Sequence, residues 1–206
     1  MDLKLYVITD EKVGLSRSHS FLAEEALKGG ATAIQLRDKE KGGRELYRIG
    51  VKIRELTRRY KALFIVNDRL DIAMAVGADG VHLGTEDLPV SVARRIAGKN
   101  FIIGASVSSP EEALLAEKEG ADYISAQSIF RTSSKENVKI IGLEGLRSIV
   151  NASSLPVIAI GGINKDNVKD VIRNGAKGIA VISAVVSKED VKKAVEELRE
   201  SLEEVL

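Results

Sequence analysis

The chain has 206 residues, 44% of them apolar and 30% charged, a composition typical of a folded globular protein rather than a disordered one. Its net charge of +1 gives no reason to expect nucleic acid or an acidic membrane as a partner, and the lack of cysteine excludes disulfides and thiolate metal sites. The length fits one domain over residues 1–206, and no segment approaches the roughly 20 apolar residues of a membrane span. Because the first apolar run is also too short for a signal peptide, we expect a cytoplasmic protein.

Eight short runs rich in β-branched residues alternate along the chain with segments of helical period. Each run is apolar almost throughout, as is typical of parallel strands covered on both faces. The runs are LYVITD (5–10), TAIQLR (32–37), LFIVND (63–68), GVHLG (80–84), FIIGAS (101–106), YISAQSIF (123–130), PVIAIGG (156–162) and GIAVISAV (178–185). This alternation predicts parallel strands joined by right-handed helical crossovers.

The segments between the runs show the signals of helices. Residues 43–60 repeat apolar side chains at the spacing of one helical face. Ser109 and Pro110 are expected to open a later helix as its N-cap and first residue, and Gly120 to end it. A last helix is expected from about Lys188 onward.

The string Gly-Ala-x-x-(Ile or Val) precedes the second, fourth, sixth and eighth runs, at Gly30, Gly77, Gly120 and Gly175. Each glycine is expected to end a helix in the left-handed conformation. The recurrence fits a repeat of two strand–helix units, although Gly-Ala is also a good turn that needs no shared ancestry. Eight units fit a closed (β/α)8 TIM barrel better than an open doubly wound sheet, which is the alternative.

In such a barrel the functional residues lie at the C-terminal ends of the strands and in the loops that follow them. Polar side chains gather at these places in the sequence. They include Gln35, Arg37, Lys39, Asn67, Asp68, His82, Asp87, Ser106, Ser108, Thr132, Ser134, Lys135 and Ser183. We therefore expect the active site at this end of the barrel.

Two carboxylates, Asp68 and Asp87, follow neighbouring predicted strands. Oxygen ligands without a histidine cluster or a thiolate suit Mg²⁺. Taken singly, Asp68 is equally well explained as a helix N-cap, and Asp87 as a turn or cap residue before Pro89. Their convergence at one barrel mouth favours the metal site.

Three cations follow the same strands. Arg37 and Lys39 alternate at a strand end, so that both can point into the mouth, and Lys135 lies in a hydroxyl-rich loop. Cations around a divalent metal indicate a diphosphate site. The alternatives are an ordinary surface position, or pairing of Arg37 with a neighbouring carboxylate.

Gly161 and Gly162 let backbone N–H groups approach an anion, and Asn164 is expected to cap the next helix. With Ser183 at the end of the eighth run, they predict a phosphate site between the seventh and eighth loops. A phosphate held at this position is a recurrent use of the barrel.

The chain has two histidines. His82 lies on a predicted strand and is either a site residue or a packed histidine bonded to a backbone group. His19 precedes a helical segment and is expected at the surface. The sequence shows no nucleophile–base arrangement, Walker loop, dinucleotide fingerprint or HExxH zinc motif.

A set of linked motifs resembles the thiamine-phosphate synthase family from about Leu5 to Val185. The motifs are LYVITD, QLRDK, VNDRLDIAMAVGADGVHLGTEDLP, IIGASV, TSSK followed by GLEGL, PVIAIGGI and GIAVISA. That family condenses 4-amino-2-methyl-5-(diphosphooxymethyl)pyrimidine with a thiazole phosphate, releasing pyrophosphate and forming thiamine phosphate. The resemblance implies a Mg²⁺-dependent transferase that acts on these two small molecules.

The resemblance also implies roles for individual residues. The pyrimidine diphosphate would bind to Gln35, Arg37, Lys39, Asn67, Ser106 and Lys135. Mg²⁺ would bind to Asp68 and Asp87, and the thiazole phosphate to Thr132, Ser134, Gly162, Ile182 and Ser183. In the implied dissociative mechanism, diphosphate leaves first and the thiazole nitrogen traps the resulting carbocation. Arg37, Lys39, Ser106 and Lys135 would be the catalytic residues.

The chain departs from the family pattern in one loop. Gln127 and Ser128 stand where the family usually has Gly-Pro, and residues 131–135 read Arg-Thr-Ser-Ser-Lys where the family usually reads Pro-Thr-Lys-Thr-Lys. The hydroxyls and the final lysine are kept, whereas the rigidity that proline gives is not. Arg131 either adds a phosphate contact or faces solvent.

Three other functions fit the same scaffold. A sister group aromatises the thiazole phosphate as a tautomerase, but it weakens the diphosphate-binding cations and carries a histidine near the sixth strand. A barrel that binds phosphorylated metabolites without catalysis is a second alternative. An isomerase of sugar or indole phosphates is a third, in which the Asp68–Asp87 pair has no role. A homodimer is compatible with this fold, but nothing in the sequence selects a face for it.

Overall fold

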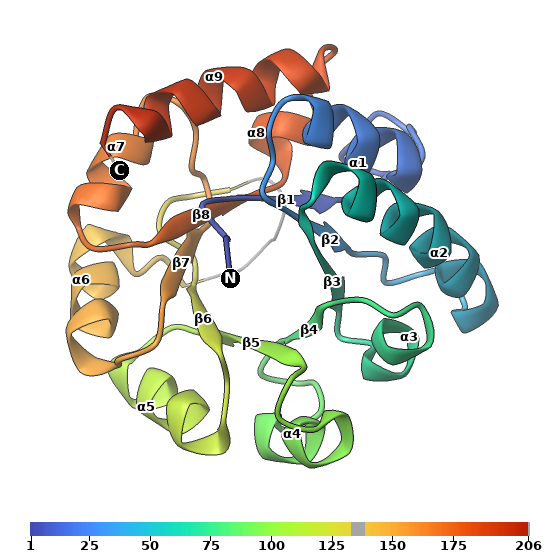
Figure 1. Cartoon of the computed structure of the whole chain (residues 1–206). Helices are drawn as coiled ribbons and strands as arrows, with labels where there is room; N and C mark the ends of the chain where they lie inside the picture. Colours follow the sequence, from blue (N-terminus) through green and yellow to red (C-terminus); the bar gives the residue numbers. More distant parts are fainter. Residues whose placement is uncertain (133–138, 206) are drawn as a thin grey trace.

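The computed structural model describes residues 1–132 and 139–205. Eight parallel strands pair in chain order, and the last pairs with the first, so that the sheet closes into a barrel (Figure 1). The strands are β1 (Leu5–Thr9), β2 (Ala33–Leu36), β3 (Leu63–Asn67), β4 (Gly80–Leu83), β5 (Ile102–Val107), β6 (Tyr123–Ala126), β7 (Val157–Ile160) and β8 (Gly178–Val181). The predicted (β/α)8 barrel is confirmed, and the open sheet is excluded.

Helices surround the barrel on its outside (Figure 1). They are α1 (His19–Lys28), α2 (Gly43–Tyr60), α3 (Leu70–Ala75), α4 (Val90–Ala97), α5 (Pro110–Glu119), α6 (Gly142–Ala152), α7 (Val168–Arg173), α8 (Ser183–Val186) and α9 (Val191–Glu203). The last helix packs against α1, α7 and α8. Within the described ranges, no helix has both the length and the apolarity to cross a membrane.

The helix ends follow the signals in the sequence. Ser109 caps α5 by accepting a hydrogen bond from the backbone N–H of Glu112, and Gly120 ends the helix with a φ of 95°. The other three Gly-Ala glycines also have positive φ, which confirms the prediction for all four. The final helix begins three residues later than Lys188, with Asp190 as its N-cap.

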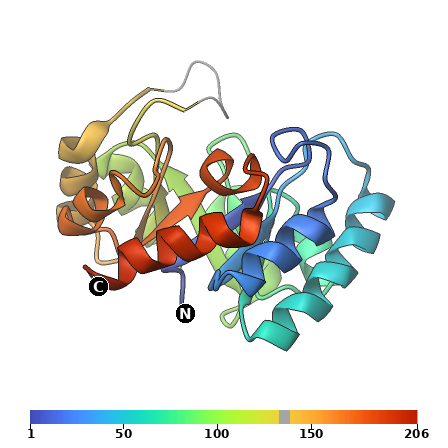
Figure 2. The same ribbon diagram turned by 90° about the horizontal axis from the view of Figure 1, so that it is seen from above.

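The strands bury side chains on both faces, which explains their nearly continuous apolar runs. Outward-pointing residues such as Val7 and Phe64 pack under the helices. Inward-pointing residues, among them Tyr6, Ile65 and Tyr123, fill the barrel interior. The N-terminus lies at the end of the barrel opposite the loops that follow the strands (Figure 2). Those loops therefore surround the open end of the filled barrel.

Candidate active site

Toward the C-terminal end of the barrel the inward-pointing side chains become polar. Asn67 pairs in register with His82 on the next strand, and Ser106 with Ser125. Together with Gln35 they line a pocket of about 800 Å³, part of it open to solvent. The strand alternation that packs the interior thus also places polar groups at the base of the pocket.

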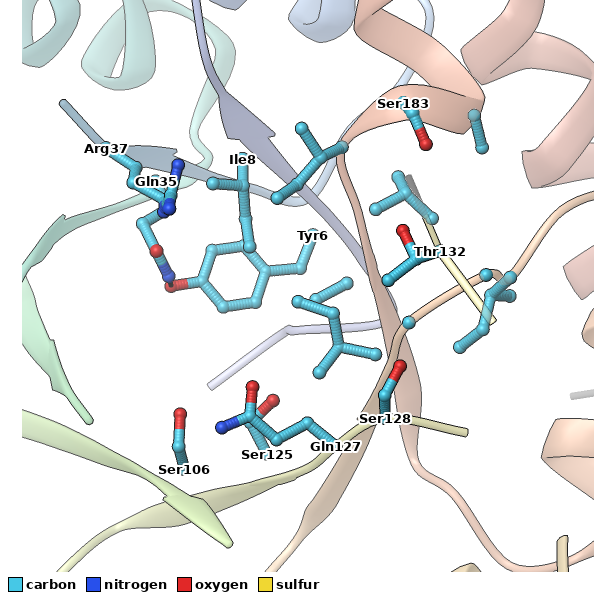
Figure 3. A pocket seen from close by; sticks show the side chains of 18 of the residues that line it. Tyr6, Ile8, Gln35, Arg37, Ser106, Ser125, Gln127, Ser128, Thr132 and Ser183 are labelled. Carbon is cyan, nitrogen blue, oxygen red and sulfur yellow. Dashed lines mark hydrogen bonds between the residues drawn. The ribbon is translucent and has the colours of Figure 1, made fainter. Parts of the chain in front are cut away.

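Most of the predicted binding residues lie in this pocket. Those that line it are Gln35, Arg37, Asn67, Ser106, Thr132, Gly162, Ile182 and Ser183. Gln35 and Arg37 lie on one side of the pocket, and Thr132 and Ser183 on another (Figure 3). Ser134 and Lys135 lie outside the described residues. The structure therefore brings the lining residues of this set together, and their roles toward ligands stay predictions.

The two predicted metal ligands lie in the loops that follow β3 and β4. Asp68 comes after Asn67 and has a positive φ of 61°. It is not the N-cap of α3, because Arg69 occupies that position, so the capping alternative is wrong. Asp87 accepts a hydrogen bond from the backbone N–H of Gly84 at 2.7 Å, and it therefore has the turn role that was its alternative.

The electrostatics around Asp68 favour a bound cation. Burial and the nearby carboxylate of Asp87 raise the pKa of Asp68 to about 6, against the opposing effect of Lys39 and Arg37. Lys39 is 60% exposed, and its ammonium lies 3.8 Å from Asp68, so solvent screens this contact. The two neighbouring carboxylates of Asp68 and Asp87 form a set of oxygen donors that fits Mg²⁺.

Arg37 lines the pocket and also forms an ion pair. Its Nη1 donates to Oδ2 of Asp10 at 2.7 Å, and both side chains are largely buried. The alternative of pairing with a neighbouring carboxylate is thus correct, and it is compatible with a place in the site. The guanidinium has five N–H donors, so that one end can be held while others face a ligand.

The loop after β7 needs glycine at two successive positions. Gly161 and Gly162 have φ values of 105° and 65°. A Cβ at Gly161 would overlap the hydroxyl oxygen of Ser128, and one at Gly162 would overlap the carbonyl oxygen of Arg131. Close packing against residues 128–131 therefore holds the predicted phosphate loop in place.

The prediction that Asn164 caps the helix after the glycine loop is wrong. The residue at the N-cap of α7 is Asn167, three positions later. Asn164 instead accepts a hydrogen bond from the backbone N–H of Asp166 in the turn before that helix. The Asn167 amide donates to the carbonyl oxygen of Gly162, so it is this residue that ties the glycine loop to the helix.

Comparison with known proteins decides the family. The family model described as thiamine monophosphate synthase matches residues 5–185. A curated relative from Pyrococcus furiosus, named thiamine-phosphate synthase, is 59% identical over 99% of this chain and 97% of its own length. The chain belongs to the thiamine-phosphate synthase family.

Two further relatives extend this result. One from Methanoregula boonei, also named thiamine-phosphate synthase, is 55% identical and covers 98% of this chain and 94% of its own. A solved structure of thiamine phosphate pyrophosphorylase from Pyrococcus furiosus has a TM-score of 0.93 at 58% identity. It covers 99% of this chain and 97% of that one. The likeness to the thiamine-phosphate synthase family thus spans the whole barrel.

Gln127 and Ser128, which replace the Gly-Pro usual in thiamine-phosphate synthases, both line the pocket. Ser128 donates from its hydroxyl to the carbonyl oxygen of Phe130, and its own carbonyl accepts from Ile141. These bonds hold the start of the loop by hydrogen bonding where the family pattern has a proline ring. The substitution therefore places polar groups in the site.

His82 is held by side chains. Its Nδ1 lies 2.9 Å from the hydroxyl of Tyr123, and its Nε2 lies 3.0 Å from that of Ser106. His82 is buried, as the packed-histidine alternative predicts. That alternative named a backbone group as its partner, and the two contacts given above are to side-chain hydroxyls. His82 thus lines the pocket beside Ser106.

The prediction that His19 lies at the surface is wrong. Its side chain is fully buried, with Nδ1 2.8 Å from Thr9 and Nε2 3.0 Å from Asp38. The ammonium of Lys41 lies 2.6 Å from Glu11 and 3.1 Å from the same Asp38. Although Glu11, His19 and Asp38 come close enough to ligate a metal, Lys41 already supplies the positive charge there. The cluster fastens the loop after β1 to the loop after β2.

Sequence reasoning missed several residues of the site. Tyr6 and Ser125 line the pocket, and Asp10 holds Arg37. Strand alternation offers a signal for two of them, since Tyr6 and Ile8, or Tyr123 and Ser125, fall on one face of their strands. The same alternation, applied to every strand, predicts which side chains point into the barrel interior.

Proposed function

We propose that this chain condenses 4-amino-2-methyl-5-(diphosphooxymethyl)pyrimidine with thiazole phosphate to give thiamine phosphate and pyrophosphate. One observation carries the proposal: a single pocket joins a cationic side next to two carboxylates with a glycine and hydroxyl side. Membership of the thiamine-phosphate synthase family supports it. The arrangement suits two phosphorylated ligands that must meet within one cavity.

The diphosphate belongs on the side of Arg37. Asp10 holds the guanidinium from β1, which keeps its orientation fixed before the ligand arrives. Lys39, whose ammonium lies beside Asp68, and Asn67 at the end of β3 add an ammonium and an amide. Fixed donors of this kind stabilise negative charge as it develops on a leaving group.

Mg²⁺ would be held by Asp68 and Asp87, whose crowded charges fit a divalent cation. When bound, it would supply Lewis-acid stabilisation of the departing diphosphate. The chain's own part is to keep both carboxylates in place. The tight turn of Gly84 to Asp87 and the left-handed backbone at Asp68 do this.

The thiazole phosphate belongs on the opposite side of the pocket. Gly162 offers its backbone between β7 and α7, and Thr132 and Ser183 offer hydroxyls. Phosphate binding at the seventh and eighth loops is common in barrels of this class. Ser134, which the family resemblance adds to this set, falls outside the described residues.

In the reaction, the bond between the pyrimidine methylene carbon and the diphosphate oxygen breaks, and the oxygen keeps the electron pair. The thiazole nitrogen then donates its lone pair to form the new carbon–nitrogen bond. The residues lower the barrier by stabilising the diphosphate and by holding the two rings together. This chemistry needs no strong general base.

The direct test is to incubate the purified protein with both substrates, once with Mg²⁺ and once with EDTA, and to follow thiamine phosphate and pyrophosphate. We expect both products to form together and only with metal. Absence of product from a folded protein that binds thiazole phosphate would contradict the proposal. The sister tautomerase would then be assayed with the non-aromatic thiazole precursor, and binding without turnover would indicate a non-catalytic barrel.

A further inference from the structure

A continuous chain of hydrogen bonds crosses the barrel interior at the base of the pocket. The Gln35 amide lies 2.6 Å from the hydroxyl of Tyr6, which lies 3.2 Å from the hydroxyl of Tyr123. That second hydroxyl lies 2.9 Å from Nδ1 of His82, whose Nε2 lies 3.0 Å from Ser106. Five strands contribute one residue each. Both ends of the chain, Gln35 and Ser106, line the pocket, as do Tyr6 and His82 between them.

The packing of the interior keeps these groups in place. The ring of Tyr123 stacks on His82 with centroids 5.5 Å apart and meets Tyr6 edge-on at 6.3 Å. Gly104 makes this arrangement possible, because a Cβ there would overlap the ring of Tyr123. Burial raises the pKa of both tyrosines, so each phenol keeps its proton and donates one hydrogen bond.

Because each phenol has one proton, the direction of donation must agree along the chain. If Tyr6 donates to Tyr123, then Tyr123 donates to Nδ1, and a neutral His82 carries its proton on Nε2. His82 then donates to Ser106, whose own proton turns to the pocket, and Gln35 presents its carbonyl oxygen there. In the opposite direction Ser106 donates to His82, and Gln35 presents its amide N–H to the pocket. A mixed direction leaves either two lone pairs facing each other or a proton without an acceptor in the chain.

We propose that Tyr6, Tyr123 and His82 are positioning residues that couple the two pocket-facing ends, so that one end accepts a hydrogen bond whenever the other donates one. The inference rests on the proposed function and adds to it. An aminopyrimidine ring carries amino N–H donors and ring nitrogen acceptors. When the ends are coupled, one accepts a hydrogen bond from the ring while the other donates one to it. This pairing fixes the orientation of the ring before the diphosphate leaves.

The coupling has a spectroscopic test that does not depend on activity. The chain has only two histidines, so imidazole ¹⁵N shifts of labelled protein resolve His82, and a His19→Gln variant assigns it. Ser106→Ala removes the Ser106 hydroxyl from Nε2, and we expect the proton of a neutral His82 to lie on Nδ1, with Tyr123 donating to Tyr6. Adding Tyr6→Phe removes that acceptor, so Tyr123 donates to Nδ1 and the proton lies on Nε2.

The same tautomer in Ser106→Ala and in the double variant would overturn the coupling, as would a doubly protonated His82 in the wild-type protein. Tyr6 is linked to His82 through the hydroxyl of Tyr123, so a purely structural role of Tyr6 would not move this signal. Tyr47→Phe, at an exposed tyrosine, is the matched control and should leave both shifts unchanged. Thermal unfolding of each variant checks that the barrel stays folded.

Kinetics give the second test. Tyr123→Phe keeps the ring and removes only the hydroxyl, and we expect KM for the pyrimidine diphosphate to rise about tenfold with kcat and KM for thiazole phosphate unchanged. In the Tyr123→Phe background, Ser106→Ala should raise KM for the pyrimidine diphosphate by a much smaller factor than it does alone, because the coupling is already broken. Independent, additive effects would overturn the inference. If wild-type protein makes no thiamine phosphate, the proposed function fails, whereas the imidazole shifts still decide the coupling.

Discussion

The guanidinium of Arg37 lies 2.7 Å from the carboxylate of Asp10, and this ion pair joins the end of β2 to the end of β1. Asp10→Ala should therefore lower kcat/KM for the pyrimidine diphosphate about tenfold, because Arg37 loses the partner that orients it. Asp10→Asn should cost less, since its amide oxygen still accepts. Steady-state kinetics measure both. Glu197→Ala, which removes an exposed ion pair with Lys165, is the control and should change nothing. Equal activity of Asp10→Ala and wild type would contradict the role of Asp10.

The glycine loop after β7 should tolerate no side chain. Gly161→Ala forces a strained φ of 105° and overlaps Ser128, so we expect a loss of about 2–4 kcal/mol in the free energy of unfolding and weaker thiazole phosphate binding. Gly77→Ala is matched to it, with a positive φ but open space around the new Cβ, and should cost only about 1 kcal/mol. Denaturant unfolding compares the two, and similar losses would show that packing against Ser128 does not matter.

The cluster of Glu11, His19, Asp38 and Lys41 should make the folded protein less stable at acid pH. Burial opposes ionisation of Asp38, but hydrogen bonds from His19 and from backbone N–H groups hold its pKa well below the usual range. Its stabilising effect is therefore complete above the unfolded-state pKa of about 4 and is lost as pH falls through the folded value. Desolvation likewise opposes ionisation of the half-buried Glu11 carboxyl, yet its contact with Lys41 lowers its pKa in the same direction.

Lys41→Met should consequently lower the melting temperature at pH 7 and reduce its further fall between pH 5 and pH 3. Melting curves over this range measure the effect. Lys28→Met, at an exposed pair with Glu25, is the control and should show the wild-type dependence. If the melting temperature of Lys41→Met fell as steeply as that of the wild type between pH 5 and pH 3, this cluster would not be the cause.

Removing charge at the proposed metal site should stabilise the metal-free protein. The pKa of Asp68 is raised, which means that the folded state disfavours its ionised form. At pH 8 in EDTA, Asp68→Asn should raise the melting temperature by about 2–4 °C, while Mg²⁺-dependent product formation is lost. Glu86→Gln, next to Asp87 in sequence, serves as a charge-matched comparison. A lower melting temperature for Asp68→Asn in EDTA would argue against crowded carboxylates.

Lys135 carries a prediction from the sequence alone. Lys135→Ala should lower kcat at least about a hundredfold with a smaller change in KM, because an ammonium that stabilises the departing diphosphate acts mainly in the transition state. Single-turnover measurements isolate this step. Lys139→Ala, four residues further on and exposed, should keep normal turnover. Near-normal turnover of Lys135→Ala would reject the catalytic role.

The sequence by itself determined the elements and which of their ends carry polar groups. A strand run, a glycine that ends a helix, or the Ser109–Pro110 start of α5 depends on residues a few positions apart, so local periodicity and capping rules suffice. The same rules, combined with the barrel, placed Gln35, Asn67 and Ser106 at one mouth.

Only the tertiary structure decided which side chains meet. Tyr6 and Tyr123 are 117 residues apart, and His19 is buried because the loop with Asp38 folds over it. Arg37, after β2, likewise pairs with Asp10, after the neighbouring strand β1, whereas the sequence did not identify this partner. These contacts follow from the register in which β1 pairs with both β2 and β8 as the barrel closes. That register is a cooperative property of all eight strands, and no local pattern encodes it.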